Sequence, residues 1–316
     1  MAVPERLRRV AVIGNGIMGH GISQVFATAG KEVVMIGHQE ASLAAAMERI
    51  SESLRLFADH RLLSADDAQA ALARVTTSVR LEDAAEAELV VEAVPEDTEL
   101  KLSLFERLDA ICPPPTVLSS SSGRPASSLV DRVRHRSRVV AAHFWNPAQL
   151  LPLVEVCAGP ETAPDVVAWT VEQLRTAGKS PVVVEREIDG FIGNRLQFAL
   201  LREALALWTA GVASVEAIDT AVKASFGRRL SVTGPLESAQ LGGMATMYEF
   251  SRFLFPSLDV AGEPPQRMLG EGLYAWSDPE RGDLLAARYA ELLRHLAGAR
   301  PALRAGSSPL GGEETR

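Results

Sequence analysis

Short, uniformly apolar runs alternate with longer amphipathic stretches through the first part of the chain. Runs of Val, Leu, Ile and Ala without a polar face are typical of strands buried on both sides of a parallel sheet. They occupy residues 10–13, 32–36, 87–94, 116–120, 139–143, 153–157 and 181–185. Between them, apolar residues at three- and four-residue spacing predict helices at 17–29, 42–59, 99–111, 127–134 and 163–177 and one led by Ser64. The alternation predicts an α/β domain with a doubly wound parallel sheet over residues 1–187.

The pattern changes at Asp189. Beyond it, apolar residues follow helical periods over 196–207 and 218–222, with Gly211 and Gly227 as helix stops. The stretch 253–272 carries three prolines and no clean period, whereas 284–296 is again helical. We therefore predict an all-α second domain over residues 188–304. The polar, glycine-rich end of the chain, 305–316, is expected to be disordered.

The first apolar run ends in a glycine-rich turn, Gly14-Asn-Gly16-Ile-Met-Gly19. A dinucleotide pyrophosphate requires a sharp turn at Gly14, close backbone approach at Gly16 and tight helix-on-strand packing at Gly19. Ile17 and Met18 open the following helix, whose N-terminus faces the anion. A glycine-rich turn with no ligand is the alternative. The strand before it and the helix and second strand after it favour a Rossmann nucleotide-binding unit.

The second predicted strand ends without the acidic residue that usually follows such a turn after about twenty residues. That acid accepts hydrogen bonds from the adenosine ribose 2′-hydroxyl and repels a 2′-phosphate, but here the chain has Gly37 and His38. Gly37 would leave room for a 2′-phosphate and His38 would donate to it, so NADP stays open as an alternative to NAD. Equally, Gly37 simply ends the strand and His38 is a solvated loop residue.

Composition narrows the classes of protein. The chain has 316 residues, of which 47% are hydrophobic and 23% charged, which suits a globular protein of two domains. No apolar run approaches about 18 residues and the N-terminal stretch is charged, so neither a membrane span nor a secretory signal is expected. A net charge of −8 argues against nucleic acid as a partner. Only Cys112 and Cys157 are present, which favours a reducing cytosol and argues against a cysteine-rich metal site.

A histidine and a glutamate stand out because both fall in apolar strands. His143 lies at the end of one predicted strand and Glu155 lies inside the next. A charged residue within a buried strand needs a partner, and an imidazole is a suitable one. Such a pair would fix the tautomer of His143 and make it a better base, able to take a hydroxyl proton as hydride leaves the same carbon. Taken alone, a histidine at a strand end is more often structural, and Glu155 would equally suit a basic partner.

Four short motifs stand out between residues 120 and 195. They are Ser120-Ser-Ser122, His143-Phe-Trp-Asn146-Pro147, Val154-Glu155-Val156 and Gly190-Phe-Ile-Gly-Asn194-Arg195. Together they resemble the motifs of the L-3-hydroxyacyl-CoA dehydrogenases and of relatives that act on free acids, such as the L-gulonate 3-dehydrogenase and lambda-crystallin group. The resemblance extends to about residue 300. It implies a Rossmann domain followed by a helical domain like the C-terminal domain of 6-phosphogluconate dehydrogenase.

The resemblance also implies roles for individual residues. His143 would be the general base and Glu155 its orienting partner. Ser122 and Asn194 would hydrogen-bond the substrate oxygen; the alternatives are a polar turn for Ser122 and a helix cap for Asn194. The positions that match the lining of the cofactor cleft are Glu96, Lys101 and Asn146.

Two departures separate the chain from the CoA-dependent branch. Enzymes of that branch commonly carry a lysine on the helical hairpin after the second strand, which meets the coenzyme phosphates. The matching position here is near His60, although Ser53 is retained and Arg61 follows. Further on, the segment from Gly227 resembles the free-acid branch, with Arg229 where a cation would hold a substrate carboxylate. The alternative is that Arg229 pairs with a surface acid.

The sequence thus predicts a nicotinamide-dependent dehydrogenase that interconverts a 3-hydroxy acid and its 3-keto form. A small polar free acid is favoured over 3-hydroxybutyryl-CoA, which stays as the alternative. Hydride passes directly to the nicotinamide, so no metal is expected. The alternative of a different class is a non-catalytic protein on the same fold, either a dinucleotide binder or a structural protein. Binding of NAD(P)H without turnover of any 3-hydroxy substrate would support that alternative. By analogy with the family, we expect a cytoplasmic homodimer.

Overall fold

The computed structural model describes residues 3–270 and 273–304 and divides the chain into two compact units. The first unit contains the chain through Ile192 and again from Leu284 onward, and the second extends from Gly193 to Asp283. The predicted boundary at 187/188 lies close to this division. The return of the chain to the first unit at Leu284 was not predicted. The predicted disordered tail, 305–316, lies outside the described residues.

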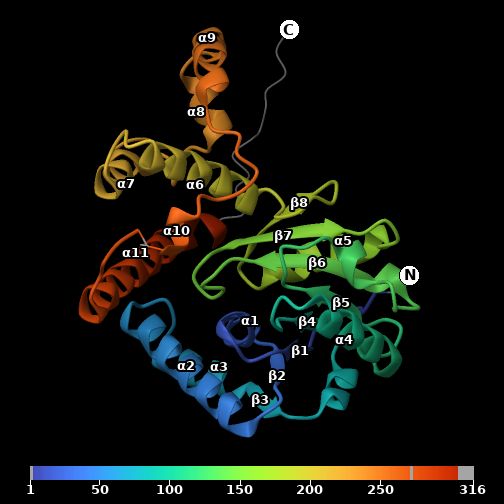
Figure 1. The fold of residues 1–316 in the computed structure, drawn as a ribbon. Helices are drawn as coiled ribbons and strands as arrows, with labels where there is room; N and C mark the ends of the chain where they lie inside the picture. Colours follow the sequence, from blue (N-terminus) through green and yellow to red (C-terminus); the bar gives the residue numbers. More distant parts are fainter. Residues whose placement is uncertain (1–2, 271–272, 305–316) are drawn as a thin grey trace, which may run out of the picture. The chain divides into compact units, whose positions relative to one another are not determined.

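The first unit is built on one sheet whose strands follow the order β3-β2-β1-β4-β5-β6-β7-β8 (Figure 1). All neighbouring strands are parallel except β6 and β7, which are antiparallel. The carboxyl ends of β1, β4, β5 and β6 therefore meet at one edge, where an α/β sheet carries its ligand site. The strands are β1 (Arg9–Ile13), β2 (Glu32–Ile36), β3 (Val75–Ser78), β4 (Leu89–Glu92), β5 (Val117–Ser120), β6 (Val139–Phe144), β7 (Leu153–Ala158) and β8 (Ser180–Val184).

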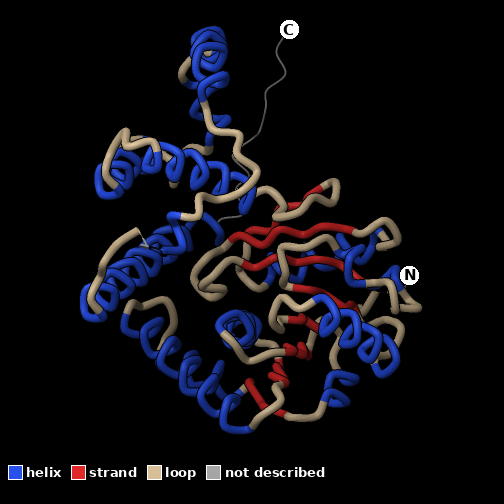
Figure 2. Tube along the Cα trace, viewed as in Figure 1, coloured by secondary structure: helices blue, strands red, loops and turns tan. Residues whose placement is uncertain are grey.

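Alternation of side chains along the buried strands creates a core on each face of the sheet. Val10 and Val12 of β1 point into one core, and Ala11 and Ile13 point into the other. The first core is closed by α1 (Ile17–Thr28), α2 (Glu40–Asp59), α3 (Ala65–Ala73) and α5 (Pro164–Thr176), and the second by α4 (Thr98–Ile111) and the 3₁₀ helix η1 (Leu81–Glu86) (Figure 2).

The prediction and the structure differ at two elements, one strand that was missed and one helix that does not form. The strand β3, Val75–Ser78, was missed because it is an edge strand of mostly polar residues. The predicted helix over 127–134 is wrong: only the short 3₁₀ helix η2 (Ala126–Leu129) forms there, and a second short turn, η3 (Arg136–Arg138), follows. Serines at 127 and 128 compete for backbone hydrogen bonds, and the Ser128 hydroxyl donates to the Pro125 carbonyl.

The second unit is helical throughout its described secondary structure. Its elements are α6 (Gly193–Thr209), α7 (Val215–Ala224), η4 (Phe226–Arg228), α8 (Pro235–Leu241), α9 (Met244–Leu254), η5 (Phe255–Ser257), α10 (Arg267–Gly270) and the start of α11 (Asp278–Arg304). From Leu284, α11 belongs to the first unit, where Leu293 is buried against Phe57, Leu62 and Leu150.

Candidate active site

The glycine turn after β1 has the geometry that a bound pyrophosphate requires. Gly14 has φ +108°, and a Cβ there would lie 2.5 Å from the Ala93 carbonyl oxygen. A Cβ on Gly19 would lie 1.8 Å from the Gly14 carbonyl oxygen, so α1 packs on the turn at a distance only glycine permits. Gly16 faces open space, with nothing within 4 Å of its Cβ position, and caps α1 with no side-chain acceptor. The first amides of α1 are thus left for an anion.

The end of β2 differs from what the sequence suggested. A Cβ on Gly37 would lie 2.8 Å from Oδ1 of Asn15 and 3.0 Å from a methyl group of Leu43, so the space beside Gly37 is filled. Asn15 is itself fixed, because its side-chain amide donates to the Ser42 hydroxyl at 2.9 Å and its backbone carbonyl accepts from Arg49 at 3.0 Å. The expected room for a 2′-phosphate next to Gly37 is therefore absent on that side. His38 is exposed, as a solvated loop residue would be.

A buried ion pair lies beneath the loop that follows β4. Glu92 and Lys101 are both almost fully buried, with Nζ of Lys101 2.7 Å from Oε1 of Glu92. The Val94 amide also donates to Oε1 at 2.7 Å, and the Ser120 hydroxyl donates to Oε2 at 2.6 Å. Lys101, which the family resemblance suggested for the cofactor cleft, thus lies below the loop. Glu92 was missed, although a charged residue in an apolar strand was the signal that singled out Glu155.

Ser122 connects this loop to the loop after β5. Its hydroxyl donates to Oε2 of Glu96 at 3.0 Å and accepts from the Arg124 amide at 3.2 Å. Glu96 is also 3.3 Å from Nε of Arg124 and 3.6 Å from Nζ of Lys101. The structure therefore brings together the predicted residues Ser122, Glu96 and Lys101 at the carboxyl ends of β4 and β5.

His143 and Glu155 form the predicted pair. They are directly opposite in the antiparallel register of β6 and β7, and Nδ1 of His143 lies 3.0 Å from Oε2 of Glu155. The carboxylate is 1% exposed and the imidazole 12%. With Nδ1 bound to the carboxylate, Nε2 is the ring nitrogen left for proton exchange.

Further donors hold the Glu155 carboxylate, among them a backbone amide and an indole. The Ile192 amide donates to Oε1 at 2.8 Å and the Trp145 indole donates to Oε2 at 3.2 Å. Ile192 follows Phe191, which has φ +48° and whose ring centroid lies 5.9 Å from that of His143. The Gly190 amide donates to the Gly123 carbonyl at 3.1 Å, which ties this segment to the loop that contains Ser122.

The remaining predicted residues lie elsewhere. Asn146 is exposed and follows Trp145 directly, at the end of β6. Asn194 is the second residue of α6 and Arg229 follows η4, so both belong to the second unit. Arg229 has no ion-pair partner among the described residues, whereas the alternative from sequence had it paired with a surface acid. The roles of Asn194 and Arg229 stay predictions.

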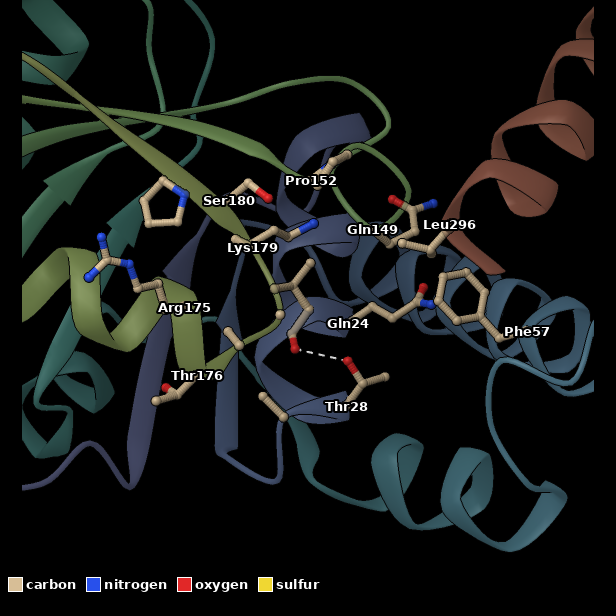
Figure 3. Close-up of a pocket in the computed structure, with 15 residues that line it drawn as sticks. Gln24, Thr28, Phe57, Gln149, Pro152, Arg175, Thr176, Lys179, Ser180 and Leu296 are labelled. Carbon is tan, nitrogen blue, oxygen red and sulfur yellow. Dashed lines mark hydrogen bonds between the residues drawn. The ribbon is translucent and has the colours of Figure 1, made fainter. Parts of the chain in front are cut away.

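A cavity of about 670 Å³ lies away from these groups, between α1, α5 and the start of β8 (Figure 3). Burial lowers the pKa of Lys179, which lines it, to about 8, and the ammonium donates to the Ala148 and Leu151 carbonyls. Gln24 also lines it, fully buried and without a hydrogen-bond partner among the described residues. None of the glycines of the turn after β1 lines this cavity, and neither His143 nor Glu155 does, so we do not assign the reaction to it.

Two further polar residues carried no sequence signal. His20, in the first turn of α1, hydrogen-bonds through Nδ1 to the Gly16 carbonyl at 2.8 Å. Burial lowers the pKa of His20; this hydrogen bond acts to raise it and the charge of Arg49 acts to lower it further. Tyr289 of α11 lies 3.2 Å from the Ser53 hydroxyl and accepts from Gln149 at 3.4 Å. The His20 contact lies within one helical turn, whereas the Tyr289 contacts join residues more than a hundred positions apart, which no local pattern encodes.

Across residues 3–270 and 273–304, no helix has the length and apolar character needed to cross a membrane. The same residues contain no group of three or more His, Cys, Asp or Glu side chains placed to hold a metal ion.

Comparison with known proteins gives matches over nearly the whole chain. Residues 9–188 match the family model described as the NAD binding domain of 3-hydroxyacyl-CoA dehydrogenase, and residues 190–276 match its C-terminal domain. The chain is 38% identical to an L-carnitine dehydrogenase of Streptomyces coelicolor over 82% of this chain and 85% of the relative. It is 32% identical to lambda-crystallin of Oryctolagus cuniculus over 77% of each chain.

A solved structure agrees with these matches. The crystal structure of 5-formyl-3-hydroxy-2-methylpyridine 4-carboxylic acid 5-dehydrogenase, described as an NAD⁺ dependent dismutase, aligns with a TM-score of 0.84 and 29% identity over 96% of this chain and all of that chain. The fold class and the family resemblance predicted from sequence are thereby confirmed. The chain belongs to the 3-hydroxyacyl-CoA dehydrogenase family and is an NAD-dependent oxidoreductase.

Proposed function

We propose that the protein oxidises the 3-hydroxyl group of a small free carboxylic acid and reduces the matching ketone, with His143 as the acid/base. The contact between His143 and Glu155 supports the second part. In oxidation, Nε2 of His143 takes the hydroxyl proton while Nδ1 stays hydrogen-bonded to the carboxylate. Glu155 then faces an imidazolium whose charge it balances.

The glycine turn fits the cofactor that the family match implies. Gly16, open at its Cβ position, and the first amides of α1 would hold the pyrophosphate, and Glu96 and Ser122 lie at the next two strand ends. Bound NAD supplies a carbon that accepts hydride from the substrate. Use of NADP in place of NAD stays a prediction.

The observation that carries the choice of a free acid is the contact between α11 and α2. CoA-dependent relatives would meet their coenzyme on the helical hairpin that contains α2. In this chain Ser53 of α2 is 5% exposed and its hydroxyl lies 3.2 Å from that of Tyr289. Leu293, one turn further along α11, is 1% exposed and packs on Phe57. This part of α2 is therefore covered by the chain itself, in a helix that begins after the residues matched to the family's C-terminal domain.

A panel of substrates tests the proposal. Purified protein is assayed with L-gulonate, L-3-hydroxybutyrate, L-carnitine and 3-hydroxybutyryl-CoA, each with NAD and with NADP. We expect the highest kcat/KM with a free acid. A preference for the CoA ester would instead establish the alternative function, a 3-hydroxybutyryl-CoA dehydrogenase.

Arg229 is proposed to hold the substrate carboxylate. A charge-assisted contact of this kind is worth about 2 to 5 kcal/mol, so Arg229→Ala should lower kcat/KM for the free acid by about 30-fold or more. Arg229→Lys should recover part of the loss, because a point charge replaces the planar fork. Arg228→Ala, the adjacent arginine, is the control. If Arg229→Ala is harmless to every substrate, the assignment of this residue is rejected.

His143→Gln tests the mechanism. Turnover should fall by about 10²- to 10⁴-fold while NADH binding stays within a few-fold of wild type. His135→Gln is the control, since His135 pairs with Asp109 at 3.1 Å and belongs to no predicted site. Near-normal turnover by His143→Gln would remove the acid/base assignment.

We also propose a homodimer assembled through the second unit. Large apolar side chains are exposed on α9 and just after it, among them Phe250, Phe253 and Phe255. Large exposed apolar side chains close together along the chain favour an interaction surface. Light scattering should give a mass of twice 33.9 kDa, and Phe253→Glu should lower it toward the monomer.

A further inference from the structure

Trp145 holds the same carboxylate oxygen that binds His143. Its indole N–H donates to Oε2 of Glu155 at 3.2 Å, while Nδ1 of His143 lies 3.0 Å from that oxygen. The two rings have centroids 5.8 Å apart and are tilted by 56°. One buried oxygen therefore serves two donors that lie close together at the end of β6.

We infer that Trp145 is a positioning residue that sets the base strength of His143 through Glu155. The inference rests on the proposed function, in which this pair is the acid/base. A hydrogen bond to a carboxylate stabilises its anionic form and takes up part of its charge. Because the indole shares Oε2, Glu155 stabilises a protonated His143 less than a carboxylate with no other donor would. Trp145 thus keeps the imidazole ready to release the proton that it accepts.

Contacts of the Ile192 amide and of Phe191 keep the Glu155 carboxylate and the His143 ring in this orientation. The Ile192 amide holds Oε1 at 2.8 Å, so rotation that would present Oε1 to His143 breaks a hydrogen bond to a buried carboxylate. Phe191 is fully buried and its ring lies beside that of His143. The imidazole therefore meets Oε2 only, and meets it together with the indole.

The charged groups nearby do not take over this role. Burial, followed by the charges of Glu187 and Glu155, raises the pKa of Cys157 to about 11, so this thiol is neutral near pH 7. Glu187 accepts from the Ser127 amide at 2.8 Å. β8, which pairs with β7 on its other side, is Ser-Pro-Val-Val-Val and has no titratable side chain. The remaining titratable residues between β8 and Gly190 are Glu185, Arg186 and Asp189.

Trp145→Phe removes the indole N–H and keeps an aromatic ring. For alcohol oxidation, the pH at which kcat/KM is half-maximal should rise by about 0.5 to 1 unit, because His143 holds its proton more tightly. The ¹⁵N NMR titration of the His143 ring, identified by its loss in His143→Gln, should rise by the same amount without substrate. Trp169→Phe is the matched control, since it makes the same substitution at a buried indole whose N–H has no partner among the described residues.

A double-mutant cycle tests whether the effect passes through Glu155. In a Glu155→Gln background, Trp145→Phe should move the NMR midpoint by less than about 0.2 unit, because the shared anion is gone. Coincident titrations for Trp145→Phe and wild type would overturn the inference, while loss of turnover in His143→Gln would still support the proposed function. If the His143→Gln variant keeps its activity, the proposed function is rejected. The NMR midpoint of the His143 ring in Trp145→Phe would still show whether Trp145 changes the base strength of His143. If Trp145→Phe does not fold, Trp145→Met, which also lacks the donor, replaces it.

Discussion

Replacing Glu92 by glutamine should destabilise the protein and weaken cofactor binding together. Glu92 is fully buried and accepts hydrogen bonds from Lys101, the Val94 amide and the Ser120 hydroxyl at 2.6 to 2.7 Å. Breaking a buried ion pair from one side typically costs about 3 to 5 kcal/mol, because the other charge is left unpaired. Glutamine keeps an acceptor for the Val94 amide, and Glu96 remains 3.6 Å from Lys101. We therefore expect a loss of about 2 to 4 kcal/mol, within the stability of about 5 to 15 kcal/mol that a folded protein has.

The assay combines urea unfolding with titration of NADH fluorescence. The loop that Glu92 holds through Val94 packs against the glycine turn, where the Ala93 carbonyl faces Gly14. Loss of the ion pair with Lys101, which lies below this loop, should weaken NADH binding by about 5- to 10-fold. Glu99→Gln is the matched control: Glu99 is an exposed residue of α4 whose pair with Arg132 should be worth about 1 kcal/mol or less.

A second variant separates charge from packing. Glu92→Leu combined with Lys101→Met removes both charges and should recover most of the lost stability, because an apolar pair of similar volume needs no counter-charge. NADH binding should stay weak in this variant, since the loop has lost its anchor. If Glu92→Gln and Lys101→Met each change the free energy of unfolding by less than about 1 kcal/mol, the buried pair does not anchor the loop and the reasoning is refuted.

Three further changes test other parts of the structure. Gly19→Ala should abolish measurable NADH binding, because its Cβ would lie 1.8 Å from the Gly14 carbonyl oxygen. Gly282→Ala, whose Cβ would have nothing within 4 Å, should leave NADH binding unchanged. Gly37→Asp alone should weaken the binding of both NAD and NADP, because the new side chain collides with Asn15. Combined with Asn15→Gly, it should raise the ratio of NAD to NADP activity. An unchanged ratio in this double variant would reject the cofactor argument. Burial alone would raise the pKa of Asp109, but hydrogen bonds from Arg138, the Arg134 amide and His135 hold it below its usual 3.8. As pH falls, the unfolded chain therefore takes up this proton before the folded protein does. Urea unfolding from pH 5 to 3 should show the stability advantage of wild type over Asp109→Asn becoming smaller. A constant difference over this range would contradict the role given to Asp109.

The sheet was predictable where burial is complete. β1, β2 and β7 lie almost as predicted because strands covered on both faces are apolar at nearly every position. The edge strand β3, with its polar Thr76 and Thr77, has no such signature. The part of α11 over 284–296 was correctly predicted as helix, but its packing on α2 depends on contacts of Tyr289 and Leu293 with residues more than two hundred positions earlier.

The candidate site was predictable where the demand is local. Glycines need their special backbone and close contacts wherever a turn meets an anion, and a charged residue in an apolar strand needs a partner. The second rule found Glu155 and, applied evenly, would also have found Glu92. The donors Trp145 and Ile192 are different, because indoles and backbone amides occur everywhere and become informative only once the fold aims them at a carboxylate.

The register of β6 and β7 limits how this protein can vary in length. His143 and Glu155 are opposed because the two strands pair residue for residue, from Val140 with Ala158 to Phe144 with Val154. Insertions or deletions in the connection, residues 145–152, leave that opposition intact as long as the pairing is kept. A single residue gained or lost inside β7, between Glu155 and its end at Ala158, would move the carboxylate to the opposite face or displace the pairing. Length variation among members of the family should therefore accumulate in the connection and stop at the strand ends.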